Sequence, residues 1–496
     1  MLFNSYVFLF IFLPLTWIAF RIACIRHVTD VALTVLLVAS LVFYSYWNPP
    51  FVLLILFSIL FNYSWGRIIQ REKKMKFLPS KLWLYSGVII NLALIIYFKY
   101  SNFLMYNFAS LTGYDWNSRN IFLPLGISFF TFQQIAYLFD TYKGSIKNDS
   151  FNHYALFVTF FPQLIAGPIV RFDQIIPQFS NLKTFVINQR NIATGISLLS
   201  IGLFKKVVIA DSLSPWVAAV FDSTSPLTFL ESWAGILCYT FQIYFDFSGY
   251  SDMAIGLGKL FNINIPINFN SPYKATSIID FWKKWHISLS IFLRDYLYIS
   301  LGGNKKGSFR RYINLMITML LGGLWHGASW NFVLWGGLHG CYLCVNHEWR
   351  HLSKSYGITT PKTIGWLGTF LATAFAWIFF RSPSFERAGE IIRGMTGLNG
   401  IFVPPNYIPI PSILNTLTNY GVKFQRPISW AVIGERWELL ILFLCLLSVV
   451  LLPNSLEWCQ KQFQKPRLSL AVVIAGSFAL SVIFMYRISE FLYFQF

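Results

Sequence analysis

Long apolar runs separated by short polar connections dominate the chain. Nine runs approach the length of a membrane span: residues 2–20, 31–47, 51–65, 82–98, 155–170, 227–245, 364–380, 439–452 and 468–485. A helix needs about 20 apolar residues to cross roughly 30 Å of hydrocarbon. The first run lacks a basic segment in front of it and an Ala-x-Ala cleavage site, so we interpret it as a retained helix and not as a signal peptide. The pattern predicts an all-α polytopic membrane protein.

The middle third of the chain has a different pattern. Five stretches mix apolar residues with Pro, Gly, Asn and charged residues, at 121–139, 192–217, 254–264, 287–301 and 312–346. Non-helical backbone at membrane depth survives only when it is buried in protein or lines a cavity. We therefore predict short and re-entrant helices around an internal cavity within one membrane domain. The predicted parts of the 1–496 domain are N-terminal helices in 1–110, a core of broken helices in 121–346, an external loop segment in 381–435 and C-terminal helices in 436–496.

Composition supports a membrane location. Hydrophobic residues make up 55% of the chain and charged residues only 12%, against about 25% charged in an average soluble domain. The net charge of +19 would suit nucleic-acid binding, but the cations lie in short loops between apolar runs. That distribution follows the positive-inside rule. We expect most of these cations to orient the chain and contact anionic lipid, and we expect no nucleic-acid partner.

The same rule predicts an orientation. Loops 21–30 and 66–81 flank one helical hairpin and are both basic, so they are expected in the cytoplasm with the N-terminus outside. Basic residues likewise place 266–311, 346–362 and 454–467 inside. The 381–435 segment and the C-terminus are then predicted to lie outside.

Two histidines stand in segments that otherwise suit lipid. His326 follows Gly322-Gly-Leu-Trp and precedes Gly, and His286 follows Phe281-Trp-Lys-Lys-Trp. A titratable group at membrane depth is costly and marks a functional site by default. The imidazole of His326 can accept and return a proton, as acyl transfer to a hydroxyl requires. The alternatives are a structural histidine bonded to a carbonyl and, for His286, an interfacial aromatic anchor on a helix that places Trp282, Trp285 and His286 on one face.

Other candidates carry weaker signals. His339 and His347 lie near Cys341 and Cys344, but one ligand pair without a second pair does not predict a zinc site, and we expect no metal. The 302–308 loop lacks the lysine after the second glycine that a Walker A loop requires. Its cations suit the phosphates of an anionic cofactor instead: Lys305, Lys306, Arg310 and Arg311. Polar or aromatic residues in the same strings are candidate tunnel-lining or supporting groups: Gln163, Asp246, Asp252, Trp285, Arg294, Asp295, Trp325 and His339.

At these strings the sequence resembles a known family. Trp-Lys-Lys-Trp-His286-Ile-Ser-Leu-Ser with Arg294-Asp295-Tyr296, Gly-Leu-Trp-His326-Gly and Pro162-Gln163 with Ala-Gly167-Pro168 are similar to the membrane-bound O-acyltransferase (MBOAT) family. The Met-Leu-Phe-Asn-Ser-Tyr start and the Asn268-Phe-Asn-Ser-Pro-Tyr273 string resemble its bacterial alginate O-acetyltransferase branch.

The resemblance implies a fold and an activity. It implies a ring of roughly 11 transmembrane helices (range about 9–13) around a thinned core with a tunnel. It makes His326 the catalytic residue and His286 its companion. The expected reaction is transfer of acetyl from a cytoplasmic thioester, acetyl-coenzyme A or a charged carrier protein, toward alginate, cellulose or peptidoglycan at a bacterial inner membrane.

Three function classes follow from these features. An O-acetyltransferase explains the histidines and the basic loop. A glycan transporter or flippase explains a cavity, although no inverted repeat is visible. A scaffold for a periplasmic enzyme explains the Pro-rich 381–435 segment, which we expect to dock a separate periplasmic acetyl-handling partner of the SGNH type.

Overall fold

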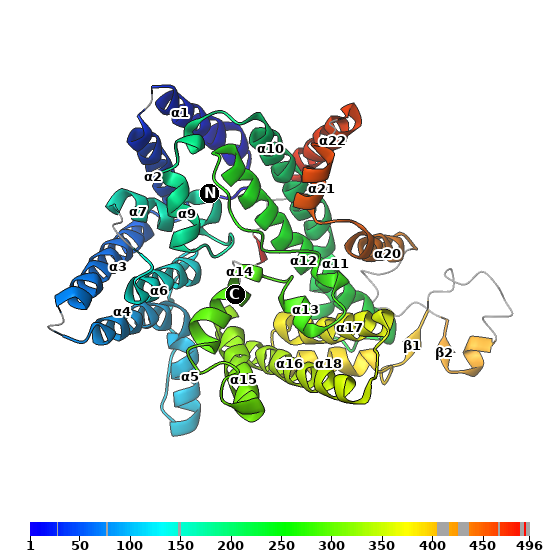
Figure 1. Cartoon of the computed structure of the whole chain (residues 1–496). Helices are drawn as coiled ribbons and strands as arrows, with labels where there is room; N and C mark the ends of the chain where they lie inside the picture. Colours follow the sequence, from blue (N-terminus) through cyan, green and yellow to red (C-terminus); the bar gives the residue numbers. More distant parts are fainter. Residues whose placement is uncertain are drawn as a thin grey trace.

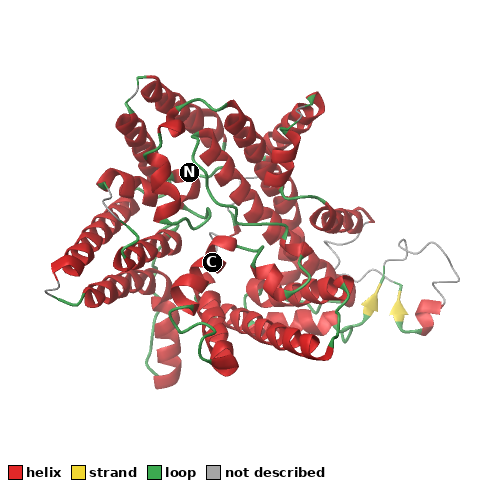
Figure 2. Cartoon of the chain, viewed as in Figure 1, coloured by secondary structure: helices red, strands yellow, loops and turns green. Residues whose placement is uncertain are grey.

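The computed structural model describes residues 1–496 except 27, 76–77, 147–149, 404–415, 425–435, 465–466, 487–490 and 493–496. The described residues are almost entirely helical (Figure 2). The N-terminal third contains η1 Phe8–Phe12, α1 Leu13–Ile25, α2 Thr29–Ser45, α3 Pro50–Met75, α4 Ser80–Ile95, η2 Ile96–Tyr100 and α5 Ser101–Thr112. These helices occupy one side of the molecule in Figure 1.

The middle of the chain alternates short and long helices. Its elements are α6 Ile127–Lys143, α7 Phe151–Thr159, α8 Phe161–Leu164, α9 Phe172–Phe179, η3 Leu182–Phe185, α10 Gln189–Leu203, η4 Phe204–Ala210, α11 Asp211–Phe221, α12 Phe229–Leu260, η5 Pro272–Lys274, α13 Ile278–Trp282, α14 Ile287–Phe292, η6 Leu293–Tyr298, α15 Gly307–His326 and α16 Trp330–Tyr356.

The last third contains three long helices and a small sheet. Its elements are α17 Lys362–Arg381, α18 Phe385–Met395, β1 Ile401–Phe402, β2 Val422–Lys423, α20 Arg436–Leu451, α21 Ser455–Gln462 and α22 Leu468–Phe484. The two strands are parallel, with Ile401 opposite Val422. Helices α20, α21 and α22 lie on the side of the molecule opposite α3 and α4 (Figure 1).

Five stretches of the described residues are long and apolar enough to cross a bilayer: Phe8–Ile25, Pro50–Met75, Ser80–Thr112, Gln189–Phe221 and Lys362–Arg381. Trp437–Leu451 and Ser455–Gln462, bent by 65°, pass the same test only when taken together, and α2 and α22 are shorter apolar helices. Many of their large apolar side chains are exposed, as on helices that face lipid. The protein is therefore a polytopic membrane protein, as the apolar runs predict.

Several predicted boundaries are wrong. The run 155–170 is not one span, because α7 ends at Thr159 and Phe160 (ψ 107°) starts a separate four-residue helix with Pro162 in its first turn. The stretch 192–217 is not broken: α10, η4 and α11 form one 33-residue helix. Most of the stretches 227–245 and 254–264 belongs to one helix, α12, which ends at Leu260. Uniformly buried helices carry no periodic pattern, so their ends cannot be read from hydropathy.

Glycines let α12 pack closely on the α10–η4 helix. A Cβ on Gly256 would lie 2.7 Å from the Gly195 carbonyl oxygen, and a Cβ on Gly202 would lie 2.5 Å from that of Gly249. Such close backbone approach is typical of membrane helix pairs. It makes α12 the buried centre of the molecule, with nearly every residue from Ala234 onward shielded from solvent.

Contacts between helix ends sort those ends into two sets. Arg21 Nη2 donates to the Leu260 carbonyl at 3.3 Å, and Lys274 Nζ donates to the Leu452 carbonyl at 2.6 Å. Lys205 bonds both to Asp252 of α12 and to Ser455 after α20, so the ends of α1, α12 and α20 lie on one side. This is the side that the basic loops predict to be cytoplasmic.

The opposite ends also meet one another. The Tyr6 hydroxyl donates to the Val482 carbonyl at 2.9 Å, and Arg381 pairs with Asp222 at 2.9 Å. The chain start thus lies beside the end of α22, and the end of α17 lies beside Asp222; because α22 and α17 both begin next to basic loops, we group these opposite ends as the second set. This grouping agrees with the alternation of basic and weakly charged loops, whichever set faces the cytoplasm.

The 381–435 segment is more ordered than a predicted loop. Helix α18 packs on α12, because Gly394 approaches Ser232 so closely that a Cβ would lie 2.0 Å from its hydroxyl. The proline-rich part around Pro404 and Ser412 lies outside the described residues. At the chain's end, Leu492 N donates to Asp246 Oδ2 at 3.1 Å, so this part of the tail reaches the interior.

Candidate active site

His286 lies at a break between two helices. Helix α13 ends at Trp282, a turn follows, and His286 caps α14 with φ 41° and ψ 55°. A left-handed conformation is uncommon in residues other than glycine and clusters at functional sites. The predicted single helix with Trp282, Trp285 and His286 on one face is therefore wrong. The break turns His286 into the protein, where it is fully buried.

Asn268 fixes the position of His286. Its Oδ1 accepts hydrogen bonds from Ser288 N at 3.1 Å and Ser288 Oγ at 2.8 Å, and it lies 3.2 Å from His286 Nδ1. An atom that accepts from a backbone N–H is an oxygen, so His286 Nδ1 must be the donor in this contact. The neutral ring then carries its lone pair on Nε2.

Ser288 links this site to the 160–171 segment. Its Oγ accepts from Ile169 N at 2.9 Å. A cavity of about 40 Å³ lies beside it, with Arg171 among its lining residues. The irregular chain after α8 thus supports the histidine from behind. Sequence analysis named Asn268 only as the first residue of the Asn268–Tyr273 string that resembles a family motif. It did not identify Ser288 as a residue that supports the site.

His326 is the last residue of α15. It is 4% exposed and is surrounded by aromatic rings, with centroids 5.0 Å away for Trp325, 5.0 Å for Trp335 and 5.2 Å for Phe380. The His286 ring lies 6.5 Å from the His326 ring. Two imidazoles 40 residues apart in sequence therefore share one buried, aromatic site.

The glycines around His326 serve helix packing. A Cβ on Gly323 would lie 2.2 Å from the Phe332 carbonyl oxygen, and a Cβ on Gly336 would lie 2.2 Å from the Met319 carbonyl oxygen. They allow α15 and α16 to approach closely just before His326. This close packing fixes the direction in which α15 presents the histidine.

Two residues of the N-terminal third hold the end of α15. Lys99 Nζ donates to the carbonyls of Trp325 at 2.8 Å and His326 at 2.9 Å, and the Tyr100 hydroxyl donates to that of Leu324 at 2.6 Å. The last carbonyls of a helix have no partner within the helix, and a cation there also suits the helix dipole. Lys99 and Tyr100 lie on η2, a π-helical turn of a kind found often at functional sites. Sequence analysis missed both residues; the only signal was a lysine at the end of an apolar run.

The Trp335 ring separates His339 from His326. His339 Nδ1 accepts from Trp282 Nε1 at 3.3 Å, and its ring contacts Trp335 at 4.8 Å. Trp335 in turn contacts His326. Trp285 packs on Trp377 at 5.0 Å in the same aromatic wall. These residues shape the site from behind Trp335.

The predicted carboxylates have lysine partners. Asp246 pairs with Lys206 at 2.6 Å, and Asp252 pairs with Lys205 at 2.7 Å. Both aspartates are buried on α12, and within the described part of the chain their ion pairs are with these two lysines. Gln163 donates to the Phe157 carbonyl at 2.9 Å and so supports the turn between α7 and α8.

Arg294 and Asp295 form a charged cluster on η6. Asp295 pairs with Arg294 at 2.6 Å and also with Arg171. Partial burial alone would raise the pKa of the Asp295 carboxyl, but hydrogen bonds from the two arginines hold that pKa below its ordinary value. Through Arg171, this cluster links η6 to the chain just after the 160–170 segment.

The basic set lies at the far end of α15 from His326. Its four members belong to the turn before α15 and to the helix's first turn: Lys305, Lys306, Arg310 and Arg311. A 20-residue helix is about 30 Å long, so no cation of this set lies beside the histidines. The N-terminus of such a helix suits an anion. Among the described residues, no group of three or more His, Cys, Asp or Glu side chains is arranged to hold a metal.

Comparisons with known proteins find one family across the region that contains these histidines. Residues 146–385, which contain both histidines, match MBOAT, the membrane-bound O-acyltransferase family. The chain is 44% identical over 428 residues to a "Peptidoglycan O-acetyltransferase" of Helicobacter pylori, covering 81% of each chain. It is 41% identical over 400 residues to a "Probable alginate O-acetylase AlgI" of Azotobacter vinelandii, covering 80% of this chain and 78% of the relative. A "Teichoic acid D-alanyltransferase" of Streptococcus thermophilus is 28% identical over 47% of this chain and 58% of its own length.

Proposed function

Because the chain belongs to the membrane-bound O-acyltransferase family, we propose that it moves acetyl from cytoplasmic acetyl-coenzyme A to a cell-envelope glycan. The observation that carries the proposal is the pair of buried imidazoles, His286 and His326, 6.5 Å apart. Each lies at a helix end in the interior of a polytopic membrane protein. Family membership assigns an acyltransferase, so the transporter and the non-catalytic scaffold are set aside.

His326 is the general base in this proposal. It removes the proton from the acceptor hydroxyl while the hydroxyl oxygen attacks the thioester carbonyl carbon. The tetrahedral intermediate then releases the thiolate, which takes the proton back from the imidazolium. The ester forms, the thioester breaks, and the histidine is restored. A positioned base of this kind contributes 10²–10⁴-fold.

His286 orients a reactant beside His326. Its hydrogen bond to Asn268 places the lone pair on Nε2, which suits it to accept a hydrogen bond from a hydroxyl. The 40 Å³ cavity next to Ser288 and Arg171 supports a path toward the donor side. We assign this path to the inner part of a tunnel through a ring of roughly 11 helices.

The donor is held at a distance from the histidines. Coenzyme A carries its phosphates at one end and its thioester at the other. The four cations at the start of α15 suit the phosphates, and the thioester arm then extends along α15 toward His326. Lys305 and Lys306 are exposed, as a site for a soluble cofactor requires.

The acceptor side faces the periplasm in this proposal. The relatives named for peptidoglycan and for alginate support a glycan acceptor, and we favour an alginate-like exopolysaccharide at a bacterial inner membrane. We assign the second group of helix ends, with both termini, to the periplasm. A separate SGNH-type partner takes the acetyl group there and docks on residues 381–435. Leu398 of this segment is 74% exposed, so Leu398→Cys should react with an impermeant thiol reagent in intact cells; reaction only after lysis would reverse this topology.

The central test uses purified protein in liposomes. His326→Ala should insert normally and lose acetyl transfer from acetyl-coenzyme A by 10²–10⁴-fold. His351→Ala is the control, because His351 is exposed near the end of α16. Near-normal transfer by His326→Ala would end the assignment of the base.

A further inference from the structure

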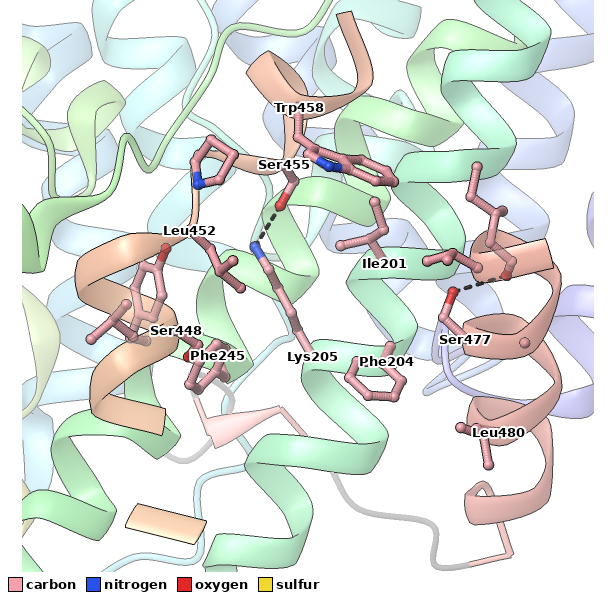
Figure 3. A pocket seen from close by; sticks show the side chains of 16 residues that line it. Ile201, Phe204, Lys205, Phe245, Ser448, Leu452, Ser455, Trp458, Ser477 and Leu480 are labelled. Atoms are coloured by element: carbon pink, nitrogen blue, oxygen red, sulfur yellow. Dashed lines mark hydrogen bonds between the residues drawn. The ribbon is translucent and has the colours of Figure 1, made fainter. Parts of the chain in front are cut away.

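A large pocket lies between the C-terminal helices and the α10–α12 pair, and neither histidine lines it. Its volume is about 510 Å³. The walls come from α10, η4, α12, α20, α21 and α22, and Lys205, Phe245, Leu452, Trp458 and Leu480 are among the lining residues (Figure 3). None of the proposed catalytic or donor-binding residues lines it. The proposed reaction therefore leaves the pocket unexplained.

The pocket has one polar end. Lys205 Nζ points toward Ser455, whereas Phe204, Phe245 and Leu480 line the other end (Figure 3). Lys205 Nζ donates to Ser455 Oγ at 2.7 Å and to Asp252 Oδ2 at 2.7 Å. A lysine ammonium has three protons, and these two bonds to described residues use two of them. The third can donate to an oxygen atom in the pocket, where the Tyr244 ring also lies 5.9 Å from Nζ.

The polar end coincides with a basic bend of the chain. Helix α20 ends at Leu451 and α21 begins at Ser455, with an angle of 65° between them. The bend is held by Lys274, which donates to Leu452. Exposed Lys461 and Arg467 lie on α21 and just before α22. This is the set of helix ends that carries the basic loops, so the polar end lies at a membrane surface and the apolar end points toward the hydrocarbon.

We propose that this pocket binds an anionic phospholipid. One acyl chain fills the apolar end, and an ester or phosphate oxygen of the lipid accepts the remaining proton of Lys205. The Lys205–Asp252 pair has no net charge, so the attraction for a negative headgroup comes from Lys461 and Arg467. Basic residues at a membrane surface attract anionic lipid headgroups.

The pocket's size argues against a partner's transmembrane helix. A helix about 10–12 Å in diameter occupies roughly 400–600 Å³ in each 5.4 Å turn. A pocket of about 510 Å³ therefore accommodates about one turn of a helix. A single acyl chain is narrow enough to lie along it with the headgroup at the bend.

Gly476 provides a way to fill the pocket. It lines the pocket from α22, and a Cβ added there would meet no atom within 4 Å. Gly476→Trp should therefore occupy the apolar end without disturbing the backbone. Gly368→Trp is the matched control, because Gly368 is also exposed in an apolar helix, has the same open surroundings and lies outside the pocket.

The experiment uses phosphatidylglycerol with a photoreactive acyl chain in nanodiscs. Crosslinks mapped by mass spectrometry should fall on residues 473–480 in the wild type and in Gly368→Trp, and should decrease at least tenfold in Gly476→Trp. Unlabelled phosphatidylglycerol should compete at least tenfold better than phosphatidylethanolamine. In Lys205→Met/Asp252→Asn, which removes the pair without leaving a buried charge, labelling should persist at reduced affinity.

Three results would overturn the proposal. Equal labelling of the two tryptophan variants would mean that ordinary surrounding lipid reacts. Equal competition by the two phospholipids would remove the headgroup preference. Absence of wild-type labelling at 473–480 would mean that the pocket does not take up lipid.

Discussion

The contact between Lys99 and the end of α15 leads to a specific prediction. Lys99→Met keeps the length and the apolar part of the side chain but removes the ammonium. The carbonyls of Trp325 and His326 then lose donors at 2.8 and 2.9 Å. Hydrogen bonds to charged groups contribute about 1.5–3 kcal/mol each, so roughly 3–6 kcal/mol that holds this helix end is lost.

Loss of that restraint should affect the rate more than donor binding. Lys99 contacts the backbone of His326 but lies far from the basic end of α15. A misplacement of about 1 Å can lower a rate about 10²-fold, equivalent to about 2.7 kcal/mol at 1.36 kcal/mol per factor of ten. We expect kcat for acetyl transfer to fall about 100-fold, with the donor KM changed less than about threefold.

The assay is acetyl transfer from labelled acetyl-coenzyme A in liposomes, with inserted protein quantified. Lys99→Arg, which keeps a cationic donor, should recover activity to within about tenfold of wild type. Tyr100→Phe removes only the bond to Leu324, worth about 1 kcal/mol, and should cost about fivefold. Lys81→Met is the control, because Lys81 is exposed at the start of α4.

Two outcomes would refute this reasoning. If folded Lys99→Met turned over within twofold of wild type, the lysine would not position the histidine. If Lys99→Met failed to fold, Tyr100→Phe would still decide, because an unchanged kcat in that variant would separate this contact from catalysis.

Further predictions address the rest of the site. Asn268→Ala should lower kcat at least tenfold, because Asn268 Oδ1 orients the ring of His286. Asn268→Asp keeps the acceptor oxygen and should retain more activity. Equal loss of activity in both variants would contradict a role for that acceptor. Gly323→Ala should reduce thermal stability and activity because its Cβ meets a carbonyl at 2.2 Å, while Gly337→Ala, whose Cβ has only a 3.5 Å contact, should be near neutral in both measurements. A variant that neutralises the four cations of the basic set should have a donor KM about tenfold higher and a nearly unchanged kcat: Lys305, Lys306, Arg310 and Arg311. An unaltered KM would mean that these cations only orient the chain in the membrane. The folded-state pKa of Asp295 lies below its unfolded value, so its ion pairs stabilise the fold above about pH 4 and are lost as the pH falls through the lower folded-state pKa. The Tm of Asp295→Asn in detergent should therefore be below that of wild type at pH 7 and approach it at acidic pH. An equal Tm at pH 7 would contradict this contribution.

The sequence by itself determined the class of protein and the two residues to test first. Apolar runs of span length specify membrane helices because a bilayer accepts few other structures. Short basic loops predicted the grouping of helix ends, since charge decides which loops stay on one side. His286 and His326 stood out because titratable groups at membrane depth are costly. The family and its reaction class were recognisable in the strings around them.

Sequence patterns misplaced helices wherever burial was complete. Helix α12 carries Asp246 and Asp252, which lie between the two stretches 227–245 and 254–264 that the sequence analysis kept apart. In the folded chain Lys206 and Lys205 neutralise them inside the protein. Hydropathy assigns a cost to each residue separately, whereas the cost of a buried charge depends on a partner from another helix. The continuity of α12 was therefore decided by tertiary pairing.

The geometry of the site was also decided only by the tertiary structure. Asn268 reaches His286 across 18 residues, and Lys99 reaches the carbonyl of His326 across 227 residues. Neither contact leaves a periodic signal, because each residue's role comes from the atoms it meets after the chain has folded. Local pattern specifies which segments become helices in a bilayer. The direction in which a break or a helix end presents a side chain depends on polar groups from distant segments that satisfy the backbone there.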